Sequence, residues 1–114
     1  MLIGGGGADT LAPWEHGDGS LYIGGTTIYD RTAAALTAIQ AEWGRTDGGS
    51  NYQGRVDNLA AGTGLAAGYK LDATTVFNDR IKDTLVGYVG GWDWFFSSAG
   101  DIVTNDDGEY RVVV

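Results

Sequence analysis

The feature that constrains this chain most is a run of glycines near its start that ends in an aspartate and a leucine. Gly4–Gly7 is followed by Asp9 and Leu11, so residues 4–12 read G-G-x-G-x-D-x-U-x, where U is a large apolar residue. Glycine adopts positive φ angles without steric cost, which permits a tight turn with uncovered carbonyl groups. Leu11 then starts a short strand and points inward. The pattern therefore predicts a glycine-rich turn that leads into a strand.

The same turn offers the oxygen atoms that calcium prefers. A calcium ion takes about six to eight oxygen ligands and accepts carboxylates and carbonyls together. We therefore expect the carboxylate of Asp9 and the carbonyls of Gly5 and Gly7 to be calcium ligands. The alternative is a glycine-rich turn near a frayed terminus that binds no ion.

This nonapeptide resembles the repeat of the RTX (repeats-in-toxin), or haemolysin-type, calcium-binding proteins, which form a parallel β-roll. Shorter echoes of the repeat give Asp18, Asp83 and Asp93 as weaker candidate ligands. The resemblance implies a degenerate C-terminal module of a secreted bacterial protein, with calcium as a folding ligand. It also implies that successive turns share each ion, so one nonapeptide cannot complete a site.

The echoes depart from the repeat where the glycines should be. Pro13 stands among the residues that replace glycines before Asp18, and Tyr88 and Val89 replace the glycine pair before Asp93. For each aspartate outside the first nonapeptide, the alternative is an ordinary turn or a helix cap.

The charge balance is acidic and favours a cation as partner. The net charge is −8, and aspartate outnumbers glutamate by 12 to 3. Aspartate suits turns and calcium loops, although net charge also serves solubility by itself. The seven basic residues are scattered, which argues against a nucleic-acid partner.

Several features bear on where the protein acts. The chain has no cysteine, which excludes disulfides and thiolate metal sites. No apolar run approaches the length of a membrane span. No cleaved N-terminal signal peptide is visible, since glycines follow Met1-Leu2-Ile3 directly. The family resemblance implies an extracellular location, and the rest of a longer parent chain is a further possible partner.

The middle of the chain predicts two helices. Tyr29, Ala33, Leu36, Ile39 and Trp43 recur every three or four residues, which predicts a helix over about 29–43. A capping-box pattern that starts at Ser50 predicts a second helix over about 51–61.

Short strands are expected on both sides of these helices. The last of them form, by prediction, a hairpin, because Asp107-Gly108 separates two β-branched runs. We therefore expect an α+β fold: short strands in a small sheet or a vestigial β-roll edge, with the two-helix hairpin packed on it. The chain is predicted to be one domain, 1–114, with calcium-repeat strands in 1–25, the helices in 26–67, and short strands and turns in 68–114.

The leading interpretation is a non-enzymatic terminal or capping module. One alternative is an adhesion or carbohydrate-binding module that uses the aromatic cluster Trp92–Phe96, although its alternation also suits a strand buried on both faces. A weaker alternative is a hydrolase built on Glu15, His16 and Asp18, which lack a nucleophile at a recognisable spacing.

Overall fold

A computed structural model describes residues 1–12, 19–45, 51–87, 92–104 and 109–114 of the chain. Its elements, in chain order, are β1 (Leu2–Ile3), β2 (Thr10–Leu11), β3 (Leu21–Ile23), β4 (Thr26–Thr27), α1 (Ala33–Trp43), α2 (Tyr52–Ala61), the 3₁₀ turn η1 (Gly64–Ala66), β5 (Val76–Phe77), β6 (Thr84–Val86), β7 (Trp94–Ser97), β8 (Ile102–Thr104) and β9 (Tyr110–Val113). The expected α+β fold is confirmed.

The chain divides into two compact units. The strand unit consists of Met1–Thr27 together with Val76–Val114, and the helical unit consists of Ile28–Thr75. The helical unit is therefore an insertion between β4 and β5 of the strand unit. The packing of the helices on the sheet stays a prediction.

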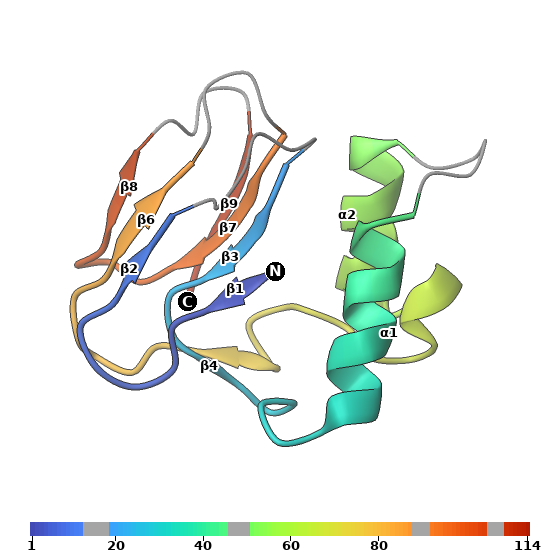
Figure 1. Ribbon diagram of the computed structural model, residues 1–114, viewed down its shortest axis with the longest axis horizontal. Helices are drawn as coiled ribbons and strands as arrows, with labels where there is room; N and C mark the ends of the chain where they lie inside the picture. Colours follow the sequence, from blue (N-terminus) through green and yellow to red (C-terminus); the bar gives the residue numbers. More distant parts are fainter. Residues whose placement is uncertain (13–18, 46–50, 88–91, 105–108) are drawn as a thin grey trace. The chain divides into compact units, whose positions relative to one another are not determined.

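The strand unit is a parallel β-roll, in which the chain passes alternately between two sheets (Figure 1). One sheet has the strand order β1-β3-β7-β9 and the other has the order β2-β6-β8, and every neighbouring pair in both is parallel. One coil thus consists of one strand from each sheet and the turns that join them. The sequence indicated only the edge of such a roll.

The core of the roll lies between its two sheets. Tyr22, Phe95 and Leu85 are fully buried and form one cluster. The rings of Tyr22 and Phe95 stack with centroids 4.8 Å apart. Leu2 of β1, Leu11 of β2 and Val103 of β8 pack against this cluster. Each coil therefore contributes one large side chain per sheet to a continuous interior.

The predicted hairpin at the end of the chain is wrong. β8 and β9 lie in different sheets, and each pairs in parallel with the strand of the preceding coil. In a roll the chain crosses to the other sheet after every strand, so a turn between two β-branched runs does not bring them into one ladder. The Asp107-Gly108 pair itself lies outside the described residues.

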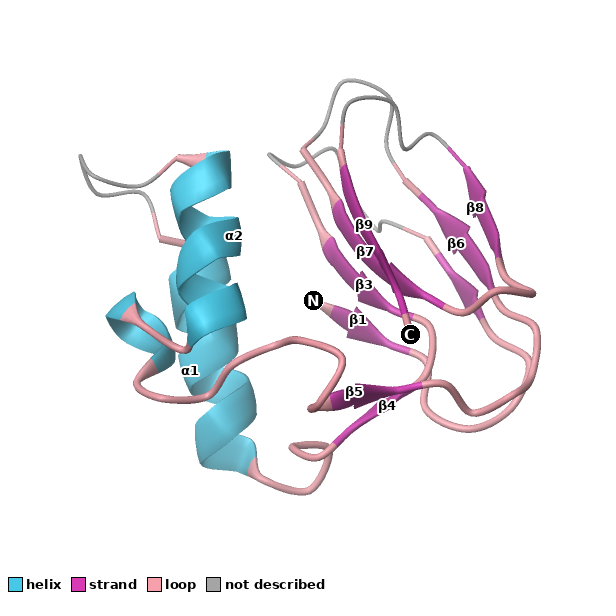
Figure 2. Ribbon diagram, turned by 180° about the vertical axis from the view of Figure 1, so that it is seen from behind, coloured by secondary structure: helices cyan, strands magenta, loops and turns pink. Residues whose placement is uncertain are grey.

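A short antiparallel ladder carries the helical insertion (Figure 2). β4 pairs with β5, and the ladder continues where the N–H of Ile28 donates to the carbonyl of Thr75 at 3.0 Å. This ladder brings the two ends of the insertion together, so that the chain re-enters the roll beside the point where it left.

Both predicted helices exist, and the first starts later than expected. α1 begins at Ala33 instead of residue 29, because Tyr29 closes a turn in which its carbonyl accepts the N–H of Thr32 at 2.8 Å. α2 begins at Tyr52, and its cap is the side chain of Asn51, which accepts the N–H of Gly54 at 2.7 Å. Ser50, the expected cap, lies outside the described residues.

The helical unit extends past residue 67, where its predicted segment ended, as far as Thr75. The N–H of Leu71 donates to the carbonyl of Leu59 at 2.8 Å, and the hydroxyl of Tyr29 donates to the carbonyl of Lys70 at 3.1 Å. These bonds attach the segment after η1 to the helices. In the part of the chain that the structure describes, neither helix is long and apolar enough to cross a membrane.

Candidate calcium site

Three aspartates stack at one end of the roll, one in each coil. Asp9, Asp83 and Asp101 each stand directly before a strand of the β2-β6-β8 sheet. The N–H of Asp9 donates to Oδ1 of Asp83 at 2.8 Å, and the N–H of Asp83 donates to Oδ1 of Asp101 at 2.9 Å. We call these three residues the aspartate ladder. The roll brings its members together although 74 residues separate the first two.

Two oxygen atoms of the ladder are buried without a hydrogen-bond partner. They are Oδ2 of Asp9 and Oδ2 of Asp83. A buried polar atom left unpaired costs about 1–3 kcal/mol, more if charged, so such atoms call for a physical explanation. A cation that binds both oxygens would supply one.

Burial raises the pKa of Asp83 above its usual range, and the carboxylates of Asp101, Asp79 and Asp9 raise it further. The N–H of Asp9 opposes this effect, because it favours the ionised form. Asp83 is fully buried, so its charge is held among like charges away from water. This is an environment in which a divalent cation lowers the electrostatic free energy.

The glycine turn lies beside the ladder and has the predicted backbone geometry. Gly5 has φ 81° and Gly7 has φ 117°, which residues with a side chain rarely adopt. The N–H of Gly7 donates to Oδ2 of Asp79 at 2.9 Å, and the N–H of Ile81 donates to Oδ1 of the same carboxylate at 2.9 Å. Asp79 therefore ties the glycine turn to the turn before β6.

Gly24 leaves the space in which two ladder carboxylates meet. A Cβ atom at this position would lie 3.1 Å from Oδ2 of Asp101 and 3.2 Å from Oδ2 of Asp83. It would also lie 3.1 Å from Cδ1 of Leu85. Any side chain here would push into the ladder and the core at once.

The remaining predicted ligands do not join the ladder. Asp93 stands before β7, a strand of the other sheet, and thus at the opposite end of the strands. Its Oδ1 accepts the N–H of Ser20 at 2.5 Å, in the same relation to the preceding coil that the ladder residues have. Asp18, together with Glu15 and His16 of the hydrolase hypothesis, lies outside the described residues.

The sequence reasoning missed Asp101 and Asp79. Asp101 lies 18 residues after Asp83, which is twice the nine-residue period of the repeat and could have revealed it. It was hidden because Phe96 and Ser97 stand where the repeat has its glycine pair. Oδ2 of Asp101 accepts the N–H of Ser98 at 2.6 Å, so the last coil closes its turn by a side chain.

The described carboxylates would provide only part of a calcium shell. Among the residues that the structure describes, no three histidine, cysteine, aspartate or glutamate side chains are grouped so as to hold a metal ion. Asp9 and Asp83 each have one buried oxygen without a hydrogen-bond partner, and calcium also accepts carbonyl oxygens and water. The carbonyls of Gly5 and Gly7 in the adjoining turn are the donors that the sequence predicts for the rest.

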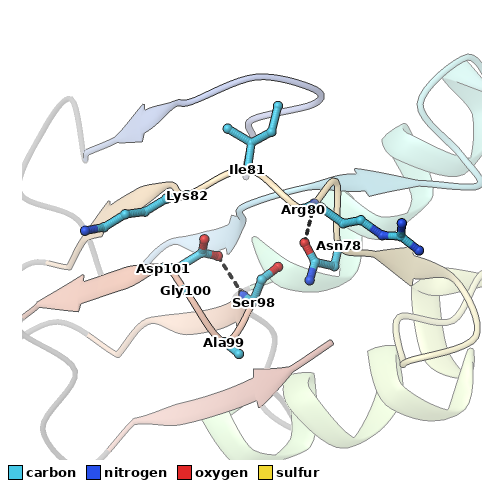
Figure 3. A pocket seen from close by; sticks show the side chains of 8 residues that line it. All are labelled: Asn78, Arg80, Ile81, Lys82, Ser98, Ala99, Gly100 and Asp101. Atoms are coloured by element: carbon cyan, nitrogen blue, oxygen red, sulfur yellow. Dashed lines mark hydrogen bonds between the residues drawn. The ribbon is translucent and has the colours of Figure 1, made fainter.

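A hollow of about 210 Å³ opens beside the ladder (Figure 3). Its lining residues are Asn78, Arg80, Ile81, Lys82, Ser98, Ala99, Gly100 and Asp101. The side chains of Arg80 and Lys82 extend away from each other, and the carboxylate of Asp101 points toward Ser98 (Figure 3). The charged groups of this lining therefore do not converge on one point.

The aromatic cluster is mostly part of the core. Trp94, Phe95 and Phe96 are almost completely buried, and the rings of Trp94 and Phe96 lie 4.7 Å apart. Trp92 is 54% exposed. A flat sugar-binding platform built on the whole cluster would need the buried rings at the surface.

Comparison with known protein families, with curated proteins and with solved structures finds no match for the chain. The resemblance to the RTX repeat therefore stays a prediction that rests on residues 4–12 and on the shorter echoes.

Proposed function

We propose that this chain is a non-enzymatic, calcium-binding terminal module of a secreted RTX-type protein, in which calcium acts as a folding ligand. The observation that carries the proposal is the pair of buried, unpartnered oxygens on Asp9 and Asp83, which adjacent coils hold beside a glycine turn. Calcium binds between them and replaces the missing hydrogen bonds with ionic contacts.

The arrangement of the roll supports the same proposal. Asp9 belongs to the one complete nonapeptide, and Asp83 occupies the equivalent place in the next coil, with Thr10 aligned to Thr84 in the strands that follow. An ion shared between coils stabilises their stacking, so its binding free energy contributes to folding. Outside the cell calcium is abundant, and extracellular modules bind it with dissociation constants of about 10⁻⁴–10⁻³ M.

Calorimetric titration with calcium tests the proposal. The unmodified protein should release or absorb heat on binding, and Asp9→Asn and Asp83→Asn should each weaken binding by about tenfold or more, because each removes an anionic ligand. Asp57→Asn, an equal loss of charge on the exposed surface of α2, should leave it unchanged. Equal binding by all four proteins would place calcium elsewhere, and an absence of binding would refute the proposal.

A further inference from the structure

The two open edges of the roll differ in character. β1 and β2 are edge strands on one side, and β8 and β9 are edge strands on the other. An open sheet edge can accept another strand unless it is blocked, for instance by a charged side chain that points inward. The residues at each edge therefore indicate whether a further strand could pair there.

In the β1-β3-β7-β9 sheet, one row of aligned side chains faces the interior of the roll, and it ends in a charged residue at the β9 edge only. Leu2, Tyr22, Phe95 and Arg111 align across the four strands and so share one face. The guanidinium Nε of Arg111 donates to Oγ of Ser97 at 3.0 Å, and Arg111 is exposed. The apolar column thus ends in a charge at β9. At the β1 edge it begins with Leu2, which is only half-buried.

The aspartate ladder also ends at the β8 edge and stays open at the β2 edge. Asp83 and Asp101 each accept the N–H of the aspartate in the preceding coil. At the β8 edge the N–H of Asp101 donates instead to the carbonyl of Ser98 at 3.0 Å, which ends the ladder. At the β2 edge Asp9 accepts no such N–H from the described residues, and its Oδ2 is buried without a partner.

We infer that the β1-β2 edge is a docking surface for one further parallel coil, which carries an aspartate before its second strand. The N–H of that aspartate donates to Oδ1 of Asp9, as the N–H of Asp9 donates to Oδ1 of Asp83, and Oδ2 stays free for the cation. An apolar side chain of the added coil covers Leu2 and Leu11, which are partly buried. The β8-β9 edge accepts no coil. The inference rests on the proposed terminal role and specifies which edge meets the rest of the protein.

A pair of extended chains tests this polarity. Leu2 aligns with Tyr22, 20 positions on, so a second copy of residues 2–21 placed before Leu2 adds one coil in register. The matched control carries residues 4–23 after Val114, where they would have to add to the β8-β9 edge. Amide hydrogen exchange, followed by mass spectrometry in calcium and in EDTA, measures protection of the original edge strands.

The N-terminal extension should slow exchange in residues 2–11 by about tenfold or more and leave the protein monomeric. The C-terminal extension should not slow exchange in β8 and β9. Leu2→Lys within the N-terminally extended chain should abolish the gain, because it places a charge in the apolar column as Arg111 does naturally. Tryptophan fluorescence confirms in each variant that the original roll is folded.

Equal protection at both edges, or none at β1-β2 in a folded protein, would overturn the inference. Concentration-dependent protection of β1 in the unextended chain would also overturn it, because the occupant would then be a second copy. The two proposals fail separately. Protection of the β1-β2 edge in EDTA, without any effect of calcium, would support the docking edge and refute the calcium site. Calcium binding without protection of that edge would support the calcium site and refute the docking edge.

Discussion

The N–H of Asp9 donates to Oδ1 of Asp83 at 2.8 Å, across 74 residues of sequence and the whole helical insertion. The carbonyl of Asp9 in turn accepts the N–H of Thr84 at 2.8 Å. These bonds fix the relative height of two coils at the point where both Oδ2 atoms are buried and unpartnered. The candidate ion site thus depends on the register in which the two coils stack, because that register places the two aspartates side by side.

Gly24→Ala should destabilise the protein by about 1–3 kcal/mol, the usual cost of forcing an extra carbon atom into a packed site. The new methyl group would crowd Asp83, Asp101 and Leu85 together. Chemical denaturation measures the loss. Gly100→Ala is the matched control, since no atom outside its chain neighbours lies within 4 Å of its Cβ position, and it should change stability by less than about 0.5 kcal/mol. Equal effects of the two substitutions would contradict this account of Gly24.

Glu42 should be essential to the helical unit. Its buried carboxylate accepts hydrogen bonds from Asn58 Nδ2 at 2.6 Å, from the N–H of Leu65 at 2.9 Å and from Arg45 Nη1 at 3.0 Å. Glu42→Ala leaves these three donors without their acceptor, and we expect a loss of about 2–3 kcal/mol in the free energy of unfolding.

Gln40→Ala, at an exposed position of the same helix, serves as the control for Glu42 and should be close to neutral. Urea denaturation followed by circular dichroism at the helical signal compares the two variants. A Glu42→Ala protein as stable as the control would show that the three donors find other partners.

The ionisation of Asp83 should oppose folding when calcium is absent. Burial and the neighbouring carboxylates raise its pKa, so the folded protein binds this proton more tightly than the unfolded chain does. This contribution to stability therefore falls as the pH rises through the folded-state pKa. In EDTA, Asp83→Asn should become increasingly more stable than the unmodified protein as the pH rises above about 4, the usual pKa of an aspartate.

Denaturation curves at several pH values measure that difference in stability. Calcium should reverse its sign at neutral pH, because calcium binds the ionised carboxylate. If the stability difference between Asp83→Asn and the unmodified protein does not change with pH, folding does not raise the pKa of Asp83.

Two tryptophans of the aromatic cluster should behave differently. Trp94→Ala should cost about 3–5 kcal/mol, because its ring is 2% exposed and packs against Phe96. Trp92→Ala should cost less than about 1 kcal/mol, because its ring is half exposed. Thermal melting compares the variants, and quenching of the Trp92 fluorescence by oligosaccharides would favour the carbohydrate-binding alternative.

Local sequence patterns predicted the helices and the glycine turn well. Both are determined by residues close together in the chain: α1 by the three-to-four spacing of apolar residues that ends at Trp43, and the turn by the positive φ angles of Gly5 and Gly7. The start of α1 was misplaced because Tyr29 fits the helical spacing, yet its ring packs edge-on against Tyr69 from a turn. Tertiary contacts of this kind leave no mark on local periodicity.

The pairing of the strands could not be read in the same way. The sequences of β8 and β9 predict a hairpin because strand propensity shows that two strands follow each other in the chain. Propensity does not show which sheet each strand joins. The partnership of Asp9 with Asp83 was equally hidden, since the insertion of Ile28–Thr75 separates two adjacent coils. Asp101 was missed because Phe96 and Ser97 replace the glycine pair of the repeat, while its own carboxylate closes the turn by accepting the N–H of Ser98.

Thermal melting in calcium and in EDTA tests the central claim most directly. With a dissociation constant of about 10⁻⁴–10⁻³ M, calcium at about 10 mM should stabilise the protein by about 1.4–2.7 kcal/mol and raise Tm by several degrees. Asp9→Asn should lose most of this increase, and magnesium should not reproduce it. A Tm that is the same in calcium and in EDTA would contradict the proposal that the aspartate ladder binds calcium as a folding ligand.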